Sequence, residues 1–159
     1  NGLEATRRIK AEFPSVAILV LTVHNDDEHI IGILEAGAAG YLTKSVFDKD
    51  VVQAIRSVVA GEAVLSDEIL RLLVKRTPSH PTKSIPLDAR EKLTVRQFEV
   101  LRMAAKGLSN ADIAQALNIS LRTVKSYLVE VFSKLGVSSR TEAVITVLRA
   151  GILTLDDLD

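Results

Sequence analysis

The 159-residue sequence contains no cysteine and no tryptophan. Without cysteine the chain can form neither disulfides nor thiolate sites, which is typical of proteins in a reducing compartment. It also has no basic-then-apolar leader and no apolar run approaching ~18 residues, so we expect neither secretion nor a membrane span and place the protein in the cytoplasm. Hydrophobic residues make up 47% and charged residues 25% of the sequence, a balance that favours a globular fold over disorder.

Groups of catalytic or metal-binding side chains are equally scarce. There is no Ser/His/Asp set, no glycine-rich phosphate loop and no paired carboxylate site, so we predict that the chain is not an enzyme and has no cofactor or metal of its own. His24 and His29 flank a run of acidic residues, but a spacing of five does not place both on one helical face. Acidic residues suit the start of a helix, so a solvated loop is favoured over a metal site there. We assign no role to His80.

Charge and proline content divide the chain. The net charge is zero, but residues 1–65 carry six Lys/Arg against nine Asp/Glu, whereas residues 66–159 carry fourteen against eleven. Three of the four prolines lie within residues 78–86 among polar side chains, a composition typical of a linker. The predicted organisation is an N-terminal domain over residues 1–65, a connecting helix (66–76) and linker within 66–92, and a C-terminal domain over 93–159.

The C-terminal part contains a series of helix-start signals. Thr94 with Gln97 forms a capping box, and Ser109 with Asp112 repeats the pattern for a short second helix. Ser120 begins a third helix, predicted to extend to residue 135, and Ser139 with Glu142 begins a last helix over residues 140–150. Two helices separated by a three- or four-residue turn, the second of them basic, form the helix-turn-helix pattern of DNA-binding proteins.

The third helix has two contrasting faces. At about 100° per residue, five apolar side chains fall on one side and must be buried: Val124, Leu128, Val131, Phe132 and Leu135. The opposite side carries two cations near the helix start and otherwise mainly short side chains: Arg122, Lys125, Ser126, Val129 and Ser133. A helix in the major groove contacts bases through its N-terminal residues, so this outer face is the expected reading surface. The alternative, an ordinary solvated face, does not account for the agreement of caps, turn length and charge.

The N-terminal part alternates helices and strands. We predict a helix over 1–13, ended by proline, a strand over 16–21, a helix to residue 36, a strand over 40–43 and a helix over 45–61. The first strand is a continuous apolar run, which is typical of a parallel sheet covered by helices on both faces. The fold class of this part is therefore α/β.

Three segments of this part resemble the second half of a two-component receiver domain: NGLE at the start, LTVH from Leu21 and AGAAGYLTK from Ala36. The resemblance implies that Thr22 and Lys44 contact a phosphoryl group on an aspartate and that Tyr41 is the aromatic residue that moves with the hydroxyl. An ammonium balances phosphate charge, and a hydroxyl hydrogen bond reports its presence.

In that family the acceptor aspartate and the acidic pair that holds Mg²⁺ precede the segment corresponding to Asn1. We therefore expect this chain to accept no phosphoryl group by itself, and expect Mg²⁺ only with an intact receiver. A sensor histidine kinase is likewise the implied partner of an intact receiver only. The N-terminal part is then a truncated, flavodoxin-like receiver whose leftover strands expose an apolar edge.

Residues 93–153 resemble the DNA-binding domain of LuxR-type regulators, through LSNADIAQALNIS and RTVKSYLVEVFSKLGVSSRTEA. A receiver half followed by this all-α, four-helix domain is similar to the NarL-type response regulators, which implies a transcription regulator that binds double-stranded DNA as a dimer. RNA polymerase is a further partner to consider. Tyr127 stands where the family usually has histidine, and Val129 where it often has a basic residue, which bears on sequence preference more than on fold.

The site predicted from these patterns has three parts. Base contacts are expected from the start and outer face of the third helix: Arg122, Thr123, Lys125, Ser126 and Val129. Phosphate contacts are expected from Ser109, Asn110, Lys134 and Arg140. The last helix is apolar on more than one face, and Ile145, Leu148 and Ile152 are predicted to form a two-fold dimer contact because Ile145 and Ile152 find no place in the expected core.

Two other interpretations are open. Region four of a sigma factor has a similar helix-turn-helix, but it predicts a helical polymerase-binding domain upstream, which the α/β pattern contradicts. A pure interaction module would use its truncated half to pair with an intact receiver and block it. A gel shift on DNA, with and without a full-length relative, separates these interpretations.

Overall fold

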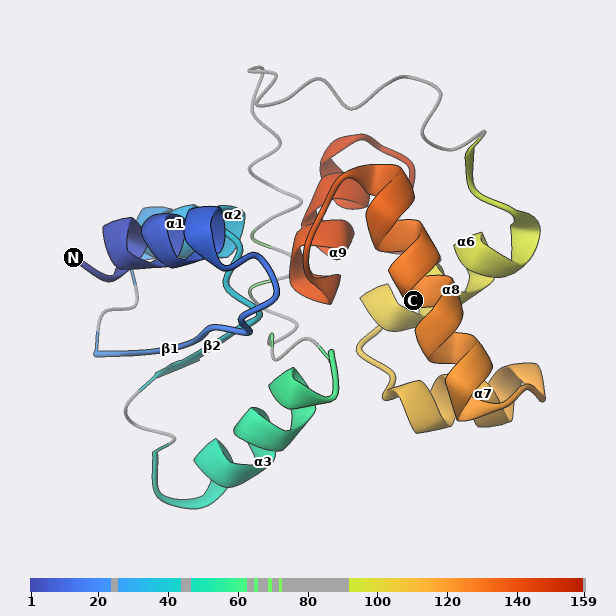
Figure 1. Cartoon of the computed structure of the whole chain (residues 1–159), viewed down its shortest axis with the longest axis horizontal. Coiled ribbons are helices and arrows are strands. Elements are labelled where there is room, and N and C mark those ends of the chain that lie inside the picture. Colours follow the sequence, from blue (N-terminus) through green and yellow to red (C-terminus); the bar gives the residue numbers. More distant parts are fainter. Residues whose placement is uncertain are drawn as a thin grey trace.

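The computed structural model describes residues 1–23, 26–43, 47–62, 65, 69, 72 and 92–158, with the backbone alone at 43, 47–50 and 155. Among these residues the chain forms an N-terminal α/β unit and a C-terminal helical unit (Figure 1). The predicted fold class is therefore confirmed. The described part contains no helix that is both long enough and apolar enough to cross a membrane. His24, Lys44, His80 and the predicted helix and proline linker within 66–92 lie largely or wholly outside the described residues.

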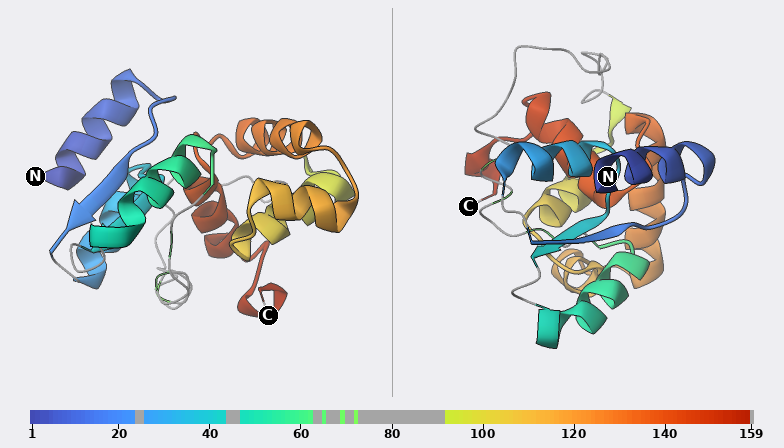
Figure 2. Two further views of the ribbon diagram at one scale, coloured as in Figure 1. Left: turned by 90° about the horizontal axis from the view of Figure 1, so that it is seen from below. Right: turned by 90° about the vertical axis from the view of Figure 1, so that its left-hand side faces the viewer.

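The N-terminal unit is built on two parallel strands, β1 (Leu19–Thr22) and β2 (Gly40–Thr43), with Leu19 opposite Gly40. Helices α1 (Gly2–Glu12) and α2 (Asp27–Glu35) lie on one side of the strands and α3 (Phe47–Val59) on the other, as Figures 1 and 2 show. The predicted order of elements is confirmed.

The first strand begins later than predicted. The Val16 amide donates to the Phe13 carbonyl at 3.1 Å and closes a turn around Pro14, so pairing with β2 starts only at Leu19. Leu21 within β1 and Val23 directly after it are exposed, which agrees with the predicted apolar edge.

The core of the N-terminal unit is formed mainly by α2. Ile30, Ile31, Ile33 and Leu34 are buried and cluster with the Tyr41 ring from β2. Helix α2 carries these four apolar side chains in only nine residues. It therefore buries apolar surface against two neighbours, the sheet on one side and the C-terminal unit on the other.

The C-terminal unit contains four α-helices in its described residues: α6 (Val95–Ala105), α7 (Asn110–Leu117), α8 (Leu121–Leu135) and α9 (Arg140–Arg149), followed by the short 3₁₀ helix η2 (Leu155–Asp157). The predicted start signals are confirmed. Thr94 and Ser109 each head a complete capping box, and the side chains of Ser120 and Ser139 accept from backbone amides three residues on.

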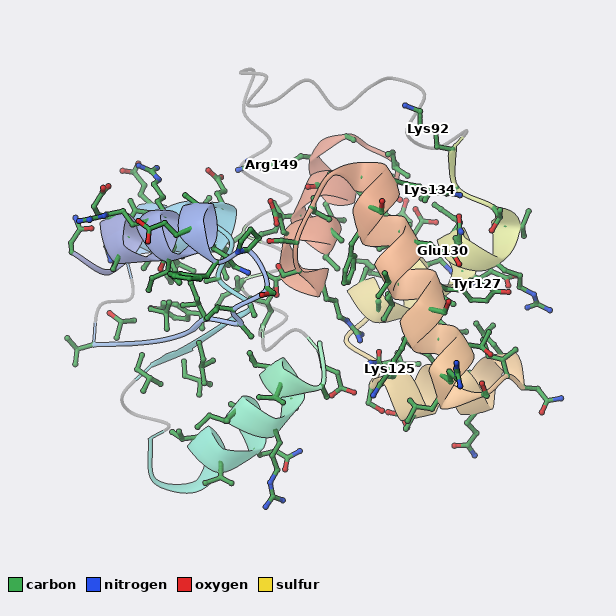
Figure 3. The ribbon with its side chains drawn as sticks, in the orientation of Figure 1. Lys92, Lys125, Tyr127, Glu130, Lys134 and Arg149 are labelled. Carbon is green, nitrogen blue, oxygen red and sulfur yellow. The ribbon has the colours of Figure 1, made fainter. Side chains whose placement is uncertain are left out.

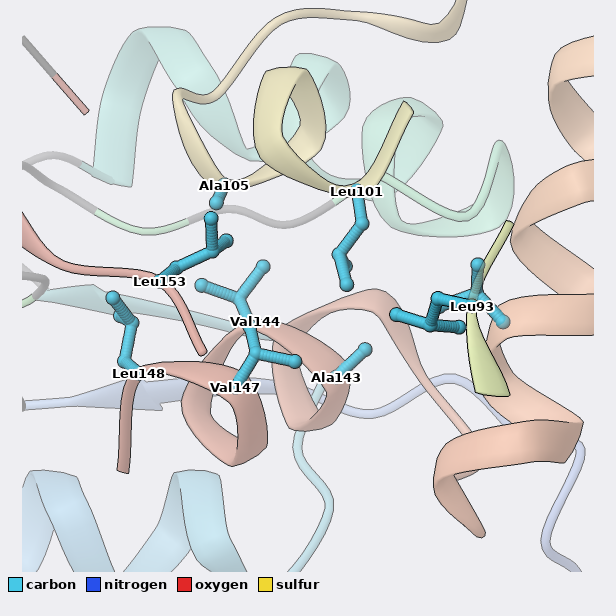
Figure 4. Packing of buried hydrophobic residues seen from close by; sticks show 9 residues of the cluster. Leu93, Leu101, Ala105, Ala143, Val144, Val147, Leu148 and Leu153 are labelled. Carbon is cyan, nitrogen blue, oxygen red and sulfur yellow. The ribbon is translucent and has the colours of Figure 1, made fainter. Parts of the chain in front are cut away.

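Two apolar clusters hold these helices together, and α8 contributes to both. One joins α6, α8 and α9 through Leu101, Val131 and Val144, all fully or nearly fully buried. Figure 4 shows Leu101 of α6 and Val144 of α9 in this cluster. The other joins α6, α7 and α8 through Val100, Ile113 and Val124. Because its inner face is buried along its length, the orientation of α8 follows from the packing of the other three helices.

Helix α9 lies between the two units and contacts both α8 and α2 (Figure 1). The Thr141 hydroxyl donates to the Ala39 carbonyl at 2.6 Å, and both residues are buried. Arg149 forms an ion pair with Glu35 of α2. The two units therefore share a packed junction centred on α9.

Candidate nucleic-acid interface

The helix-turn-helix is shaped by polar caps on either side of its turn. Asn118 ends α7 in the left-handed conformation with φ of 52°, which asparagine tolerates better than most residues. Two residues later the Ser120 hydroxyl accepts from the Thr123 amide at 3.0 Å and begins α8. The turn thus spans residues 118–120, as the sequence predicts.

The outer face of α8 is open to solvent. Arg122, Lys125, Ser126 and Val129 are all exposed, with the Val129 side chain at 66%, while Val124 on the opposite side is fully buried. Lys125 points away from the helical core in Figure 3. The predicted division of this helix into a buried and an exposed face is confirmed.

The two remaining side chains near this face are half-buried. The Thr123 hydroxyl lies 2.8 Å from that of Ser120, so it takes part in the cap of the helix. Tyr127, which replaces the usual histidine, packs against the cluster of α6, α7 and α8. Its ring therefore supports the helix rather than extending the exposed face.

Lys134 is anchored to α6 by a buried amide. The side-chain nitrogen of Gln97 donates to the Glu130 carboxylate at 2.5 Å, and the Lys134 ammonium donates to the Gln97 oxygen at 2.7 Å. The same oxygen accepts from the Thr94 amide at 3.0 Å. Gln97, which we predicted only as a capping residue, thus places the cation near the C-terminal end of α8 (Figure 3).

Ser109 and Asn110 lie at the start of α7, but their donors are engaged within the chain. The amide and hydroxyl of Ser109 both donate to the Asp112 carboxylate. The Asn110 amide donates to the Glu62 carboxylate at 2.9 Å, and its side chain donates to the Ala60 carbonyl at 3.2 Å. The start of α7 therefore faces the N-terminal unit in this structure.

Arg140 does not present a cation to solvent, which corrects its prediction as a phosphate contact. It is only 3% exposed, and its guanidinium donates to the side-chain oxygen of Asn110 and to the carbonyls of Ala104 and Leu108. Burial lowers the pKa of Arg140 to about 10, an effect that the charge of Glu62 partly offsets. The residue ties the start of α9 to the loop before α7.

The three residues predicted at a dimer contact have different surroundings. Leu148 is buried and Ile152 is half-buried, and both pack in the cluster of α6, α8 and α9. Ile145 is 4% exposed and joins the α2 cluster of the N-terminal unit. The expectation that Ile145 and Ile152 lack a core is therefore wrong here. It failed because the sequence alone does not show that α2 packs on α9.

Of the predicted phosphoryl-sensing residues, the structure brings Thr22 and Tyr41 together. The ends of β1 and β2 are adjacent, and the Tyr41 side chain forms a hydrogen bond with that of Thr22. Burial raises the pKa of Tyr41, and the hydrogen bond with Thr22 acts in the opposite direction. Across the described residues, no three His, Asp or Glu side chains are arranged to hold a metal ion.

Residues 91–147 match the luxR family of bacterial regulatory proteins, and residues 1–56 match the response regulator receiver domain. The chain belongs to the LuxR-type response regulators, with a partial receiver followed by the helix-turn-helix domain. This family consists of regulatory proteins rather than enzymes, in agreement with the prediction from the sequence.

Among its relatives is the response regulator protein VraR of Staphylococcus aureus, 37% identical over 145 residues, a match that covers 91% of this chain and 66% of VraR. Solved structures that match include RcsB of Salmonella enterica serovar Typhimurium bound to promoter rprA, at 26% identity and a TM-score of 0.40, covering 96% of this chain and 69% of RcsB. Full-length FixJ of B. japonicum matches at 25% identity and a TM-score of 0.40, covering 97% of this chain and 70% of FixJ.

Proposed function

We propose that this chain is a sequence-specific DNA-binding regulator of a two-component system, which reads the major groove with the outer face of α8. The observation that carries this proposal is the contrast between the two faces of α8. Its inner face is buried in two apolar clusters, while its outer face exposes two cations and short side chains near the helix start. A helix that is held in place by core packing on one face and exposes such a surface on the other is suited to the major groove.

In this proposal, contacts divide by position along the helices. Base edges are read by residues between the start and the middle of α8: Arg122, Thr123, Lys125, Ser126 and Val129. Lys134 near the other end contacts the DNA backbone, and the start of α7, with Ser109 and Asn110, provides a second backbone contact. Arg140 does not contact DNA itself in this proposal, but positions Asn110 through its hydrogen bond to the Asn110 side chain.

The N-terminal unit is the proposed signal-receiving part. Thr22 and Tyr41, with Lys44, would respond to a phosphoryl group in an intact receiver that also holds Mg²⁺ and meets a sensor histidine kinase. A regulator of this type also offers a surface to RNA polymerase. The 159-residue chain itself is proposed to bind DNA without a cofactor.

The test is selection of binding sites from random duplex DNA with the whole chain, followed by titration of the enriched duplex at several salt concentrations. We expect an enriched motif, preferred over a shuffled duplex, and a log–log salt slope that reports the number of phosphate contacts. A chain that enriches no motif, or that binds the shuffled duplex equally well, would rule out sequence-specific binding.

The exposed Val129 side chain predicts a thymine beneath the middle of α8. Contact with water does not stabilise this exposed apolar side chain, whereas contact with an apolar group of the DNA does. The thymine C5 methyl is the apolar group that the major groove offers. Replacing that thymine with uracil, which lacks the methyl group, is expected to weaken binding by ~0.8 kcal/mol. The loss should vanish in Val129→Ala and persist in Val95→Ala, a valine of α6 that is also largely exposed, at 76%. A motif with no favoured thymine, or a uracil effect that survives Val129→Ala, contradicts this contact.

Dimerisation through α9 gives a further prediction. Ile145 is the buried apolar residue of α9 that packs outside the C-terminal core, against α2, so a two-fold α9 contact on DNA requires α9 to part from α2. Ile145→Glu is expected to remove the cooperative gain between inverted half-sites while binding to one half-site continues. The matched control is Ile55→Glu on α3, where isoleucine is already 48% exposed. Equal cooperativity in both variants, measured by titrating single and paired half-sites, would exclude this dimer.

A further inference from the structure

The side-chain amide of Gln97 bridges two opposite charges on α8. Gln97 lies in the first turn of α6 and is only 3% exposed. Its nitrogen donates to the Glu130 carboxylate at 2.5 Å, and its oxygen accepts from the Lys134 ammonium at 2.7 Å. Both charged residues are exposed. A buried amide whose donor meets an anion and whose acceptor meets a cation restrains both side chains.

The spacing of the two charged residues also permits a different arrangement. Glu130 and Lys134 stand four residues apart along α8 (Figure 3), and a glutamate four residues before a lysine is the favoured order for an ion pair on a helix. In such a pair the ammonium would turn along α8 toward the carboxylate. The Gln97 amide instead occupies the carboxylate with an N–H and holds the ammonium toward α6.

The Lys134 ammonium can still donate to a further partner. Its bond to Gln97 uses one of its three donors, and the acceptor is a neutral oxygen, so this contact does not cancel the positive charge. A lysine side chain loses much rotamer freedom when a ligand immobilises it. Because Gln97 already restrains this side chain in the free protein, less of that entropy is lost on binding.

We propose that Gln97 is a positioning residue for the DNA backbone contact of Lys134, and that it acts by keeping this ammonium apart from Glu130. The inference rests on the proposed function, in which Lys134 contacts the DNA backbone. The partner of the ammonium is a backbone phosphate, because Lys134 follows the residues proposed to read bases and presents a point charge. Gln97 is buried and acts through Lys134 alone.

The first variant is Gln97→Met, which fills a similar volume but lacks the amide. Loss of the restraint is expected to weaken binding to the selected duplex about two- to tenfold, uniformly across sequences, and to lower the log–log salt slope. In the Lys134→Ala background the same change should have no further effect on affinity. Unchanged affinity in Gln97→Met, or a loss that persists in the Lys134→Ala background, overturns the proposal.

The matched control is Thr94→Ala, which weakens the start of the same helix. It removes the hydroxyl that accepts from the Gln97 backbone amide and leaves the Gln97 side chain in place. Its DNA affinity and salt slope should equal those of the wild type. If Thr94→Ala reproduces the loss seen in Gln97→Met, the role of Gln97 is only to support α6, and the proposal is wrong.

Glu130→Gln tests whether Gln97 keeps the two charges apart. In the Gln97→Met background the ammonium can pair with Glu130, so Glu130→Gln should recover part of the lost affinity. The same change in the otherwise unmodified chain removes one negative charge near the DNA, so the two gains are compared. The gain should be larger in the Gln97→Met background, and equal gains overturn the proposal.

A second variant at the same position, Gln97→Glu, preserves the start of α6. Its carboxylate still accepts from the Thr94 amide and the Lys134 ammonium but cannot donate to Glu130. The ammonium then lies beside two carboxylates, so DNA affinity is expected to fall about two- to fivefold while helical circular dichroism is unchanged. Wild-type affinity in this folded variant contradicts the proposal.

Failure of this inference is distinguishable from failure of the proposed function. If Lys125→Ala weakens selective binding while Lys134→Ala leaves affinity and salt slope unchanged, Lys134 makes no backbone contact. The positioning role of Gln97 then fails and the proposed function stands. If Lys125→Ala changes nothing, the proposed function fails, and the inference fails with it.

Discussion

Arg140→Met is expected to lower the free energy of unfolding of the C-terminal helices by about 3 kcal/mol. The guanidinium satisfies the buried Ala104 carbonyl, the half-buried Leu108 carbonyl and the Asn110 side chain at once, and each buried acceptor left unpaired costs about 1–3 kcal/mol. Methionine fills much of the same volume but donates no hydrogen bond. Arg140→Met also removes the free-energy cost of burying a charge, which offsets part of the loss. The expected change is therefore smaller than the sum of the costs of the unpaired acceptors. Urea denaturation followed by helical circular dichroism measures the change.

The matched control for this prediction is Arg122→Met on the exposed face of α8, which should change stability by less than about 0.5 kcal/mol. Arg140→Lys keeps the charge but lacks the planar fork that reaches three acceptors, so it should recover only part of the loss. An unchanged unfolding midpoint in Arg140→Met would show that the apolar packing of α9, and not the hydrogen bonds of Arg140, positions the loop before α7.

The helices of the C-terminal unit could be predicted from the sequence because their signals are local. Thr94, Ser109, Ser120 and Ser139 each bond an amide only three residues away, so four residues of sequence contain the whole interaction. The two faces of α8 were predictable for a similar reason, since helical periodicity alone separates Val124 from Lys125.

What the sequence did not reveal are contacts between residues far apart in the chain. Thr141 reaches Ala39 across 102 residues, and Asn110 reaches Glu62 across 48. Neither pair shares a periodic pattern or a motif. Arg140 follows the same rule: a cation near a helix-turn-helix predicts a phosphate contact, and only the packing of α9 shows that its partners are carbonyls of the chain itself.

The start of β1 shows a further limit of local prediction. The run from Val16 to Leu21 is continuously apolar, so hydrophobicity alone predicts a strand over its whole length. The turn at Pro14 delays pairing to Leu19, because strand length depends on the position of the partner and not on composition. Val16 is consequently 44% exposed.

Lys125→Ala is expected to weaken binding to the selected DNA site by ~1–3 kcal/mol and to relax specificity at one base position. Lys125 is exposed on α8 in the first half of the helix, and the buried Val124 beside it fixes the direction in which it points. A side chain held in this way can make a geometrically defined contact with a base edge, which an exposed cation on a mobile loop cannot. The measurement is a titration of the selected duplex and of its single-base variants with wild type and variant.

The matched control is Arg8→Ala on α1, which removes one exposed cation from the N-terminal unit and should leave affinity, specificity and salt slope unchanged. The salt slope distinguishes the two ways in which Lys125 could act. A loss confined to duplexes with the preferred base, at a nearly constant slope, identifies a base contact. A uniform loss across sequences, with the slope reduced by about one, would assign Lys125 to the DNA backbone instead. Unchanged affinity in every duplex would show that the outer face of α8 does not contact DNA, and would refute the proposed function of the chain.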